Sequence, residues 1–184
     1  MKIVTYLSGF KVKDSNIAIA HDDVFEIMRE LEGRWCRPFT SDTVGTILFL
    51  IQDDRFFCRS VIKPNNIMSI PVSINIEKEK WVKAKIRLPL SEGNETENVR
   101  ELLVACGCEA RSISYNRLPF SSISFKSDGE MIDIPCGDFQ LDIKINSLEG
   151  FKKAYIQGVG DYKEYGCGMI TLNNNQVINK QRDK

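Results

Sequence analysis

Histidine is almost absent from this sequence, which has one, His21, in 184 residues. Six cysteines are present, but none forms a Cys-x-x-Cys pair. A structural zinc site takes four closely spaced Cys or His ligands, so the sequence disfavours one. We therefore expect neither a bound metal nor another cofactor.

An excess of charge of either sign is also lacking. The 25 Lys and Arg residues balance the 25 Asp and Glu residues, and the sequence pI is about 6.6. This balance argues against a protein that holds nucleic acids indiscriminately by long-range attraction. A local basic region remains compatible with it, because residues 151–184 contain six Lys or Arg and three Asp or Glu.

No hydrophobic run is long enough to span a bilayer. The longest, at residues 44–51, is interrupted by Gly45 and Thr46 and is far shorter than the roughly 20 residues of a membrane-spanning helix. The N-terminus has a single Lys before an alternating stretch and no small-residue cleavage site, so it does not resemble a secretory signal. The cysteines have no framework spacing. We expect reduced thiols, a cytoplasmic location and no membrane association.

Hydrophobic periodicity predicts two successive α+β units. A period of two predicts strands, whereas spacings of three and four predict helices. In the first unit we expect strands at residues 2–12, 46–52, 55–62 and 67–76, a helix at 22–31 that Gly33 ends, and a hairpin turn at Asp53-Asp54. Pro71 places the fourth of these strands at a sheet edge or a bulge.

The second unit repeats this order. We expect strands at residues 82–90, 111–116, 121–125, 138–145 and 168–172, and helices at 98–107 and 147–157, with Ser147 as the second helix's N-cap. The first of these strands alternates apolar residues with Lys83, Lys85 and Arg87, a row that suits RNA phosphates or, as we favour, an ordinary solvated strand face. The predicted fold is two tandem ferredoxin-like (RRM-like) domains, at residues 1–78 and 79–184.

The segment GVGDYKEYGCG, residues 158–168, has glycines in two Gly-x-Gly pairs. A dinucleotide-binding loop needs a strand before it and a helix after it, and here the predicted order is reversed. Two interpretations remain: a tight structural connection, and a backbone cradle for phosphodiester groups. Lys163 within the loop, with Lys152 and Lys153 on the preceding helix, supports the cradle.

This segment resembles the C-terminal signature of the RAMP superfamily of CRISPR-associated proteins. It is most similar to the CasE (Cse-type) CRISPR RNA endoribonucleases of the type I-E Cascade complex. The matching pattern is Gly-x-Gly-x-x-Lys-x-x-Gly-x-Gly followed by a short apolar strand, and the matching residues are Gly158, Gly160, Lys163, Gly166, Cys167 and Gly168. The N-terminal strand and a histidine at the start of the first helix extend the likeness.

The resemblance implies two ferredoxin-like domains and cleavage of the repeat stem-loop in a CRISPR precursor RNA. The expected partners are this RNA and other Cascade-type subunits. His21 would be the catalytic acid or base, because an unperturbed histidine pKa of about 6.5 suits proton transfer near neutrality. The expected RNA-binding residues are Gly158, Gly160, Lys163, Gly166, Gly168, Lys152, Lys153, Arg34 and Arg37.

Alternatives remain open at this point. His21 precedes two aspartates, so it could be only a solvated residue at a helix start. A non-catalytic RAMP subunit that binds guide RNA would have the same loop with an idle histidine, and an ordinary ferredoxin-like domain would have it as a structural turn. Cys167 is better interpreted as a small buried residue than as a nucleophile, because no second histidine is present to activate it.

Overall fold

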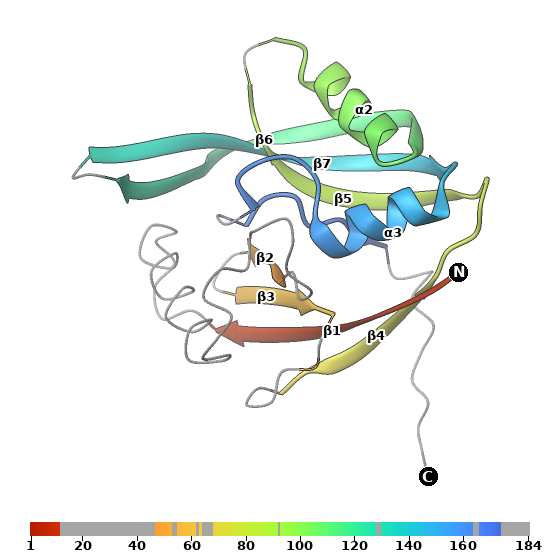
Figure 1. The fold of residues 1–184 in the computed structure, drawn as a ribbon. Helices are drawn as coiled ribbons and strands as arrows, with labels where there is room; N and C mark the ends of the chain where they lie inside the picture. The colour runs from red at the N-terminus through yellow and green to blue at the C-terminus, as the bar shows by residue number, and fades with distance from the viewer. Residues whose placement is uncertain are drawn as a thin grey trace.

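The computed structural model describes residues 1–11, 47–52, 55–61, 63, 68–91, 93–127, 130–163 and 166–173. These residues form two four-stranded antiparallel sheets and two helices (Figure 1). The predicted α+β class with tandem ferredoxin-like units is confirmed. The predicted helix at 22–31 lies outside the described residues, as do His21, Arg34 and Arg37.

The first sheet has the strand order β2-β3-β1-β4. Its strands are β1 (Lys2–Lys11), β2 (Ile47–Gln52), β3 (Arg55–Ser60) and β4 (Ile70–Asn75). Gln52 pairs with Arg55, so the connection from β2 to β3 is the two-residue hairpin that the sequence predicts. Pro71 lies in β4, which is an edge strand as expected.

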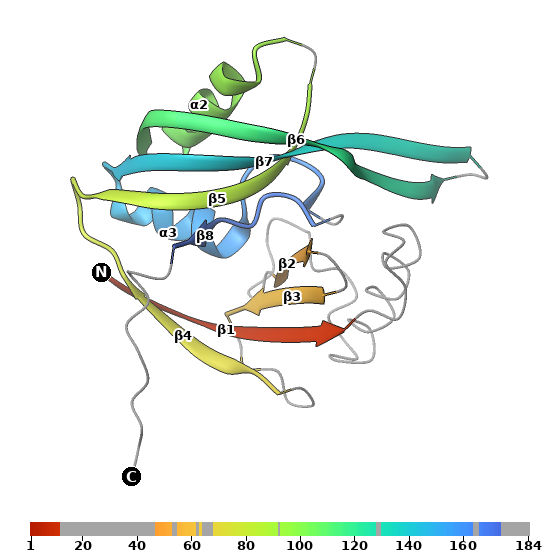
Figure 2. The ribbon, with the colours of Figure 1, turned by 180° about the vertical axis from the view of Figure 1, so that it is seen from behind.

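The second sheet has the order β6-β7-β5-β8, and Figure 2 shows the face that carries no helix. Its strands are β5 (Trp81–Pro89), β6 (Cys108–Ser127), β7 (Glu130–Ile145) and β8 (Thr171–Leu172). The separate strands predicted at 111–116 and 121–125 were wrong, because both belong to β6. The pairing of β6 with β7 shifts register between Arg117 and Ser122, so the period breaks without ending the strand.

Two helices cover the other face of the second sheet: α2 (Glu95–Ala105) and α3 (Leu148–Gln157). Asn94 and Ser147 are their N-caps, and the Ser147 hydroxyl accepts the Gly150 amide at 3.1 Å, as predicted. A Cβ at Gly150 would lie 2.7 Å from the Cys106 carbonyl oxygen, which explains a glycine where a capping box has Glu or Gln. In the described part of the chain, no helix is long and apolar enough to cross a membrane.

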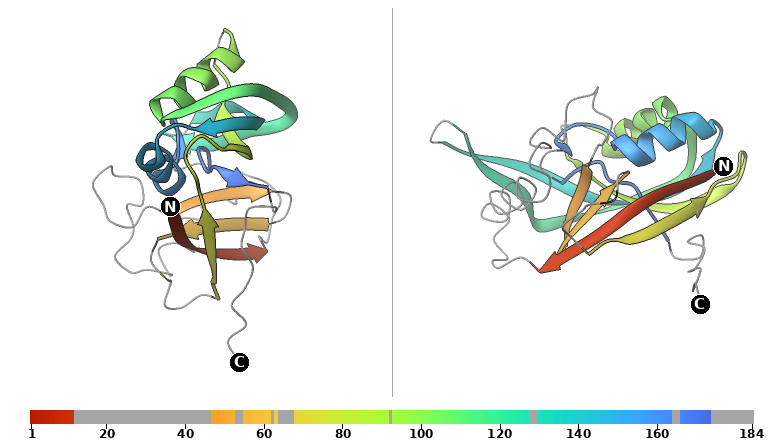
Figure 3. Two further views of the ribbon diagram at one scale, coloured as in Figure 1. Left: turned by 90° about the vertical axis from the view of Figure 1, so that its right-hand side faces the viewer. Right: turned by 60° about the horizontal axis from the view of Figure 1, so that its bottom comes forward.

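The two sheets share one hydrophobic core. Ile3, Ile74 and Ile76 of the first unit pack with the buried face of the second sheet and with α2 and α3. On β5 the buried residues are the predicted Val82, Ala84, Ile86 and Leu88. Figure 3 shows the two sheets as successive layers. The domain boundary between residues 78 and 79 stays a prediction, but the shared core means that the two units are packed together rather than loosely linked.

Candidate nucleic-acid interface

The glycine loop, residues 158–168, leads from the end of α3 toward β8. Gly158, Gly160, Gly166 and Gly168 have φ values of 78°, 74°, 88° and 80°. This left-handed region is costly for residues with a Cβ, so the backbone itself requires glycine at these positions. The paired spacing in the sequence therefore reflects four backbone positions with a positive φ.

Close neighbours impose a second requirement for glycine. A Cβ at Gly158 would lie 2.8 Å from Leu48 Cδ2, and one at Gly166 would lie 3.0 Å from Phe49 Cε2. A Cβ at Gly168 would lie 2.5 Å from the backbone oxygen of Val159. The loop thus folds tightly on itself and lies directly against β2 of the first unit.

Most backbone amides of the loop already have acceptors. The amides of Gly158, Val159, Gly166, Cys167 and Gly168 donate to the carbonyl oxygens of Ala154, Gly168, Lys163, Tyr162 and Arg87, respectively. Within the described residues, no hydrogen bond uses the amides of Gly160, Asp161 and Lys163. Among the described residues, a phosphate oxygen would therefore meet unused amide donors at Gly160, Asp161 and Lys163 rather than along the whole loop.

Lys163 packs across the glycines of its own loop. A Cβ at Gly158 would approach its Cδ to 3.2 Å, and a Cβ at Gly168 would approach its Cγ to 3.3 Å. Because glycine has no Cβ, these two positions leave room for the lysine stem. Burial raises the pKa of the Cys106 thiol, and the Lys163 charge partly opposes this rise, so the ammonium lies within electrostatic range of the end of α2. In the part of the chain that the structure describes, Lys163 forms no ion pair.

Tyr162 is a feature that sequence reasoning missed. It has a φ of 55°, unusual for a residue other than glycine, and its side chain is 39% exposed. Strained backbone at an exposed aromatic residue is common at functional sites. An exposed ring beside Lys163 is also a surface on which a nucleobase could stack. The one signal for it in the sequence is the presence of this tyrosine between the glycine pairs.

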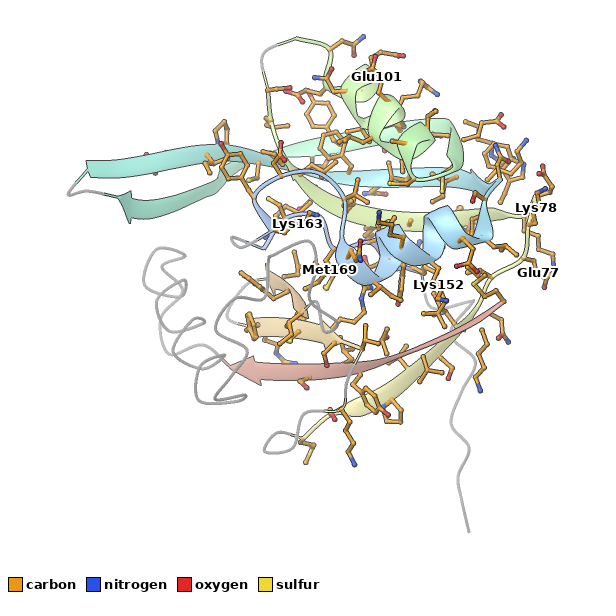
Figure 4. The ribbon with its side chains drawn as sticks, viewed as in Figure 1. Glu77, Lys78, Glu101, Lys152, Lys163 and Met169 are labelled. Carbon is orange, nitrogen blue, oxygen red and sulfur yellow. The ribbon has the colours of Figure 1, made fainter. Side chains whose placement is uncertain are left out.

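The two predicted lysines on α3 differ from Lys163. Lys152 lies within 3.8 Å of Glu149, one turn earlier on the helix, whereas Lys153 is exposed. Figure 4 places Lys152 on α3 and Lys163 in the loop. The structure thus groups Lys163 with the four glycines and leaves the α3 lysines on the neighbouring helix.

The face of the second sheet that carries no helix is called the open face here. It carries further basic residues, and most of them form ion pairs with acidic residues. Arg87 forms a two-pronged contact with Asp138, with Nε–Oδ1 and Nη2–Oδ2 distances of 2.6 and 3.0 Å. Arg111 contacts Asp142 at 2.8 Å, and Lys144 contacts Glu109 at 2.7 Å. Lys83 and Lys85 are exposed on the same face.

A cleft of about 610 Å³ lies between this open face and the first sheet. The first unit contributes Leu7, Leu50 and Phe57 to its lining, and the second contributes Lys85 and Arg87 among others. The side of the first unit is therefore apolar, whereas the side of the second unit combines charged residues with apolar ones such as Phe139 and Met169.

The cysteines that the structure describes are buried or half-buried. Cys167 is fully buried, as predicted, and its Sγ lies 3.8 Å from that of Cys136. None of the five cysteines of the described residues forms a disulfide. Burial raises the pKa of Cys108 to about 12, so this thiol is protonated at neutral pH. No group of three or more potential metal ligands comes together among the residues the structure describes.

No protein-family model matches this chain, and no curated protein matches it in sequence. Solved structures do match its fold. The CRISPR endoribonuclease Cse3 bound to a 19-nucleotide RNA is 11% identical, with a TM-score of 0.70 over 92% of this chain and 99% of its own. The CRISPR-associated protein Cas6e from Escherichia coli K-12 is 16% identical, with a TM-score of 0.65 over 91% of this chain and 98% of its own.

A chain of E. coli Cascade, in a crystal structure with a PAM-containing double-stranded DNA target, is also similar. It is 14% identical, with a TM-score of 0.57 over 90% of this chain and 96% of its own. The chain therefore has the fold of the Cse3 and Cas6e proteins over about nine-tenths of its length, as the resemblance of its C-terminal motif predicts.

Proposed function

We propose that this protein is a metal-independent endoribonuclease that cuts CRISPR repeat RNA at the base of its stem-loop. It can then stay bound to the product as a subunit of a Cascade-type complex. The likeness of the whole chain to RNA-bound Cse3 supports this proposal. The observation that carries it is Lys163, which forms no ion pair within the described residues and packs against the glycines of its own loop, near the unused amides of Gly160 and Asp161.

Cleavage without a metal uses the RNA's own 2′-hydroxyl. As the 2′-oxygen attacks the adjacent phosphorus, the P–O5′ bond breaks, giving a cyclic phosphate and a 5′-hydroxyl. The 2′-hydroxyl loses a proton and the leaving 5′-oxygen gains one, while negative charge builds up on the phosphoryl oxygens. We assign one of the proton transfers to His21.

The loop would stabilise the developing charge. Lys163 acts as a point charge on the phosphate. Among the predicted glycines, Gly160 is the one whose amide forms no hydrogen bond within the described residues. Gly158, Gly166 and Gly168 act by shaping the loop. Lys152, Lys153, Arg34 and Arg37 would contact more distant phosphates of the same RNA.

Both units contribute to this site. His21 belongs to the proposed domain of residues 1–78, and Lys163 belongs to that of residues 79–184. Catalysis therefore depends on how the loop is seated against the first unit. The cytoplasmic location stays a prediction from the sequence.

The test is incubation of the purified protein with a labelled CRISPR repeat hairpin in EDTA. Wild type should cut it, whereas His21→Ala should not cut it, and a substrate with a 2′-deoxy group at the cut position should stay intact. Glu101→Gln, an exposed change on α2, is the matched control and should cut as wild type does.

Other outcomes distinguish the alternatives. Binding of the hairpin without cutting would replace the proposal with a non-catalytic RAMP-type subunit that holds guide RNA. An unaffected His21→Ala variant would remove His21 from the mechanism. If the protein neither binds nor cuts, the glycine loop is a structural turn and the proposal fails.

A further inference from the structure

Arg59 is a buried arginine that no part of the mechanism above uses. It lies on β3 of the first sheet and is 5% exposed. Within the described residues no carboxylate pairs with it, and burial lowers its pKa. A buried cation without an acid partner is costly, so its other contacts must compensate.

Those contacts are with the second unit, far along the chain. Nη1 donates to the backbone oxygen of Ile170 at 2.6 Å, and Nη2 donates to that of Tyr155 at 2.5 Å. The guanidinium carbon also lies 3.8 Å from the centre of the Tyr155 ring. One side chain thus binds two carbonyl groups and an aromatic face at once.

The two carbonyls mark the base of the glycine loop. Tyr155 precedes Gly158 by three residues, and Ile170 follows Gly168 by two. Tyr155 is also in the last turn of α3, where carbonyl oxygens lack partners within the helix and the helix dipole is negative. Arg59 therefore ties together the chain entering the loop and the chain leaving it.

The same residue fixes the loop to the first unit. Leu48 and Phe49 of β2 pack directly against Gly158 and Gly166, respectively, so closely that neither glycine has room for a Cβ. Strand β2 pairs with β3, which carries Arg59. Loss of the guanidinium would leave two carbonyls unpaired at this junction, which costs more than the hydrogen bonds alone. A lysine would keep the charge but not the planar fork that reaches both oxygens.

We propose that Arg59 is a positioning residue, which seats the glycine loop on the first unit and so sets where Lys163 meets the RNA. The catalytic consequence rests on the proposed function; the seating itself does not. Arg59 touches no reacting atom, and it acts by holding the two ends of the loop.

Amide hydrogen exchange tests the seating without any RNA. In Arg59→Met, the amides of Gly158, Val159 and Gly168 should exchange about tenfold faster than in wild type, while those of α2 stay unchanged. Arg100→Met is the matched control, because Arg100 also donates to a backbone carbonyl, that of Ala110 at 2.7 Å, away from the loop. Equal acceleration in the loop and in α2, or none in the loop, would overturn the proposal.

A double-mutant cycle tests the link to Lys163. Single-turnover cleavage by Arg59→Lys should be about tenfold slower than by wild type, but within about twofold of its parent when Lys163→Ala is already present. A role in overall stability alone would slow cleavage by the same factor in both backgrounds, and that result would overturn the link.

The two experiments separate the proposals. If the wild-type protein does not cut the hairpin, the proposed endoribonuclease activity fails, and the exchange comparison still decides whether Arg59 seats the loop. If the wild type cuts and exchange in the loop is unchanged in Arg59→Met, the activity stands and the positioning role fails.

Discussion

The glycine loop and the open face of the second sheet both carry basic side chains, but in different electrostatic states. On the open face, Arg87, Arg111 and Lys144 each contact a carboxylate, so much of their charge is compensated. In the loop, Lys163 has no such partner within the described residues. A basic residue can attract phosphate only to the extent that its charge is not already neutralised.

The basic side chains of the two regions also differ in how freely they can move. The stem of Lys163 packs against two glycines whose positive φ disfavours other residues, and these contacts restrict the base of the side chain. Lys83 and Lys85 project from an exposed strand surface, where a long side chain keeps its freedom. A fixed cation loses less entropy when it binds an anion than a mobile one does.

The largest effect should come from filling the loop itself. Gly168→Ala adds a Cβ 2.5 Å from the Val159 oxygen at a φ of 80°, and we expect it to lower the free energy of unfolding by at least about 2 kcal/mol. Gly9→Ala is the control: its Cβ would have no neighbour closer than 3.7 Å, so stability should change by less than about 1 kcal/mol. Urea unfolding measures both, and equal losses would contradict a loop-specific requirement.

How much the sequence could predict follows from how local each feature is. The strands β1 to β5 were predicted because their alternation is contained in a few neighbouring residues, as with the buried Val82 and Ala84. The break in β6 was misread as a strand end, because a register shift depends on the partner strand β7. The local hydrophobic pattern predicts that a strand is present, but the pairing with a neighbouring strand determines where that strand ends.

The candidate site was predictable in part for the same reason. The glycine spacing and Lys163 are local, so the sequence singled them out. Arg59 was missed because its two acceptors lie 96 and 111 positions away. The pairing of Arg87 with Asp138, 51 positions apart, was equally invisible. Only the position of Arg59, directly after three apolar residues of β3, hinted at a buried role.

A smaller effect is expected on RNA affinity, and it should differ between the glycine loop and the open face. Lys163→Ala should weaken binding of the repeat hairpin about tenfold, since a charged contact with phosphate is lost. Lys85→Ala removes the same charge from the open face and should weaken binding by less than about twofold. Titration of labelled hairpin at a single salt concentration measures both. A larger loss in Lys85→Ala would move the interface to the sheet.

A further variant frees the charge of Arg87 from its ion pair and tests whether this pairing limits RNA binding by the open face. Asp138→Asn removes the carboxylate that holds Arg87, and the salt dependence of RNA binding should become steeper by up to about one unit of slope. Glu101→Gln changes the net charge equally but lies on α2. The affinity of each variant is measured over a range of salt concentrations. If both variants respond alike, compensation at Arg87 does not explain why the open face would bind RNA weakly.

The smallest effect should be a pH-dependent change in the free energy of unfolding, caused by the titration of Glu109 on the open face. A hydrogen bond from Lys144, together with its charge, lowers the pKa of Glu109. A group whose pKa is lower in the folded state stabilises the protein above its unfolded pKa, and this contribution is lost as the pH falls through the folded value. Wild type should therefore be slightly more stable than Glu109→Gln near neutrality, with a difference that shrinks below a pH of about 4.3, the ordinary pKa of glutamate. Both side chains reach solvent, so the difference stays small. Urea unfolding at several pH values measures it, and a difference that grows as the pH falls would show that Glu109 and Lys144 do not stabilise each other.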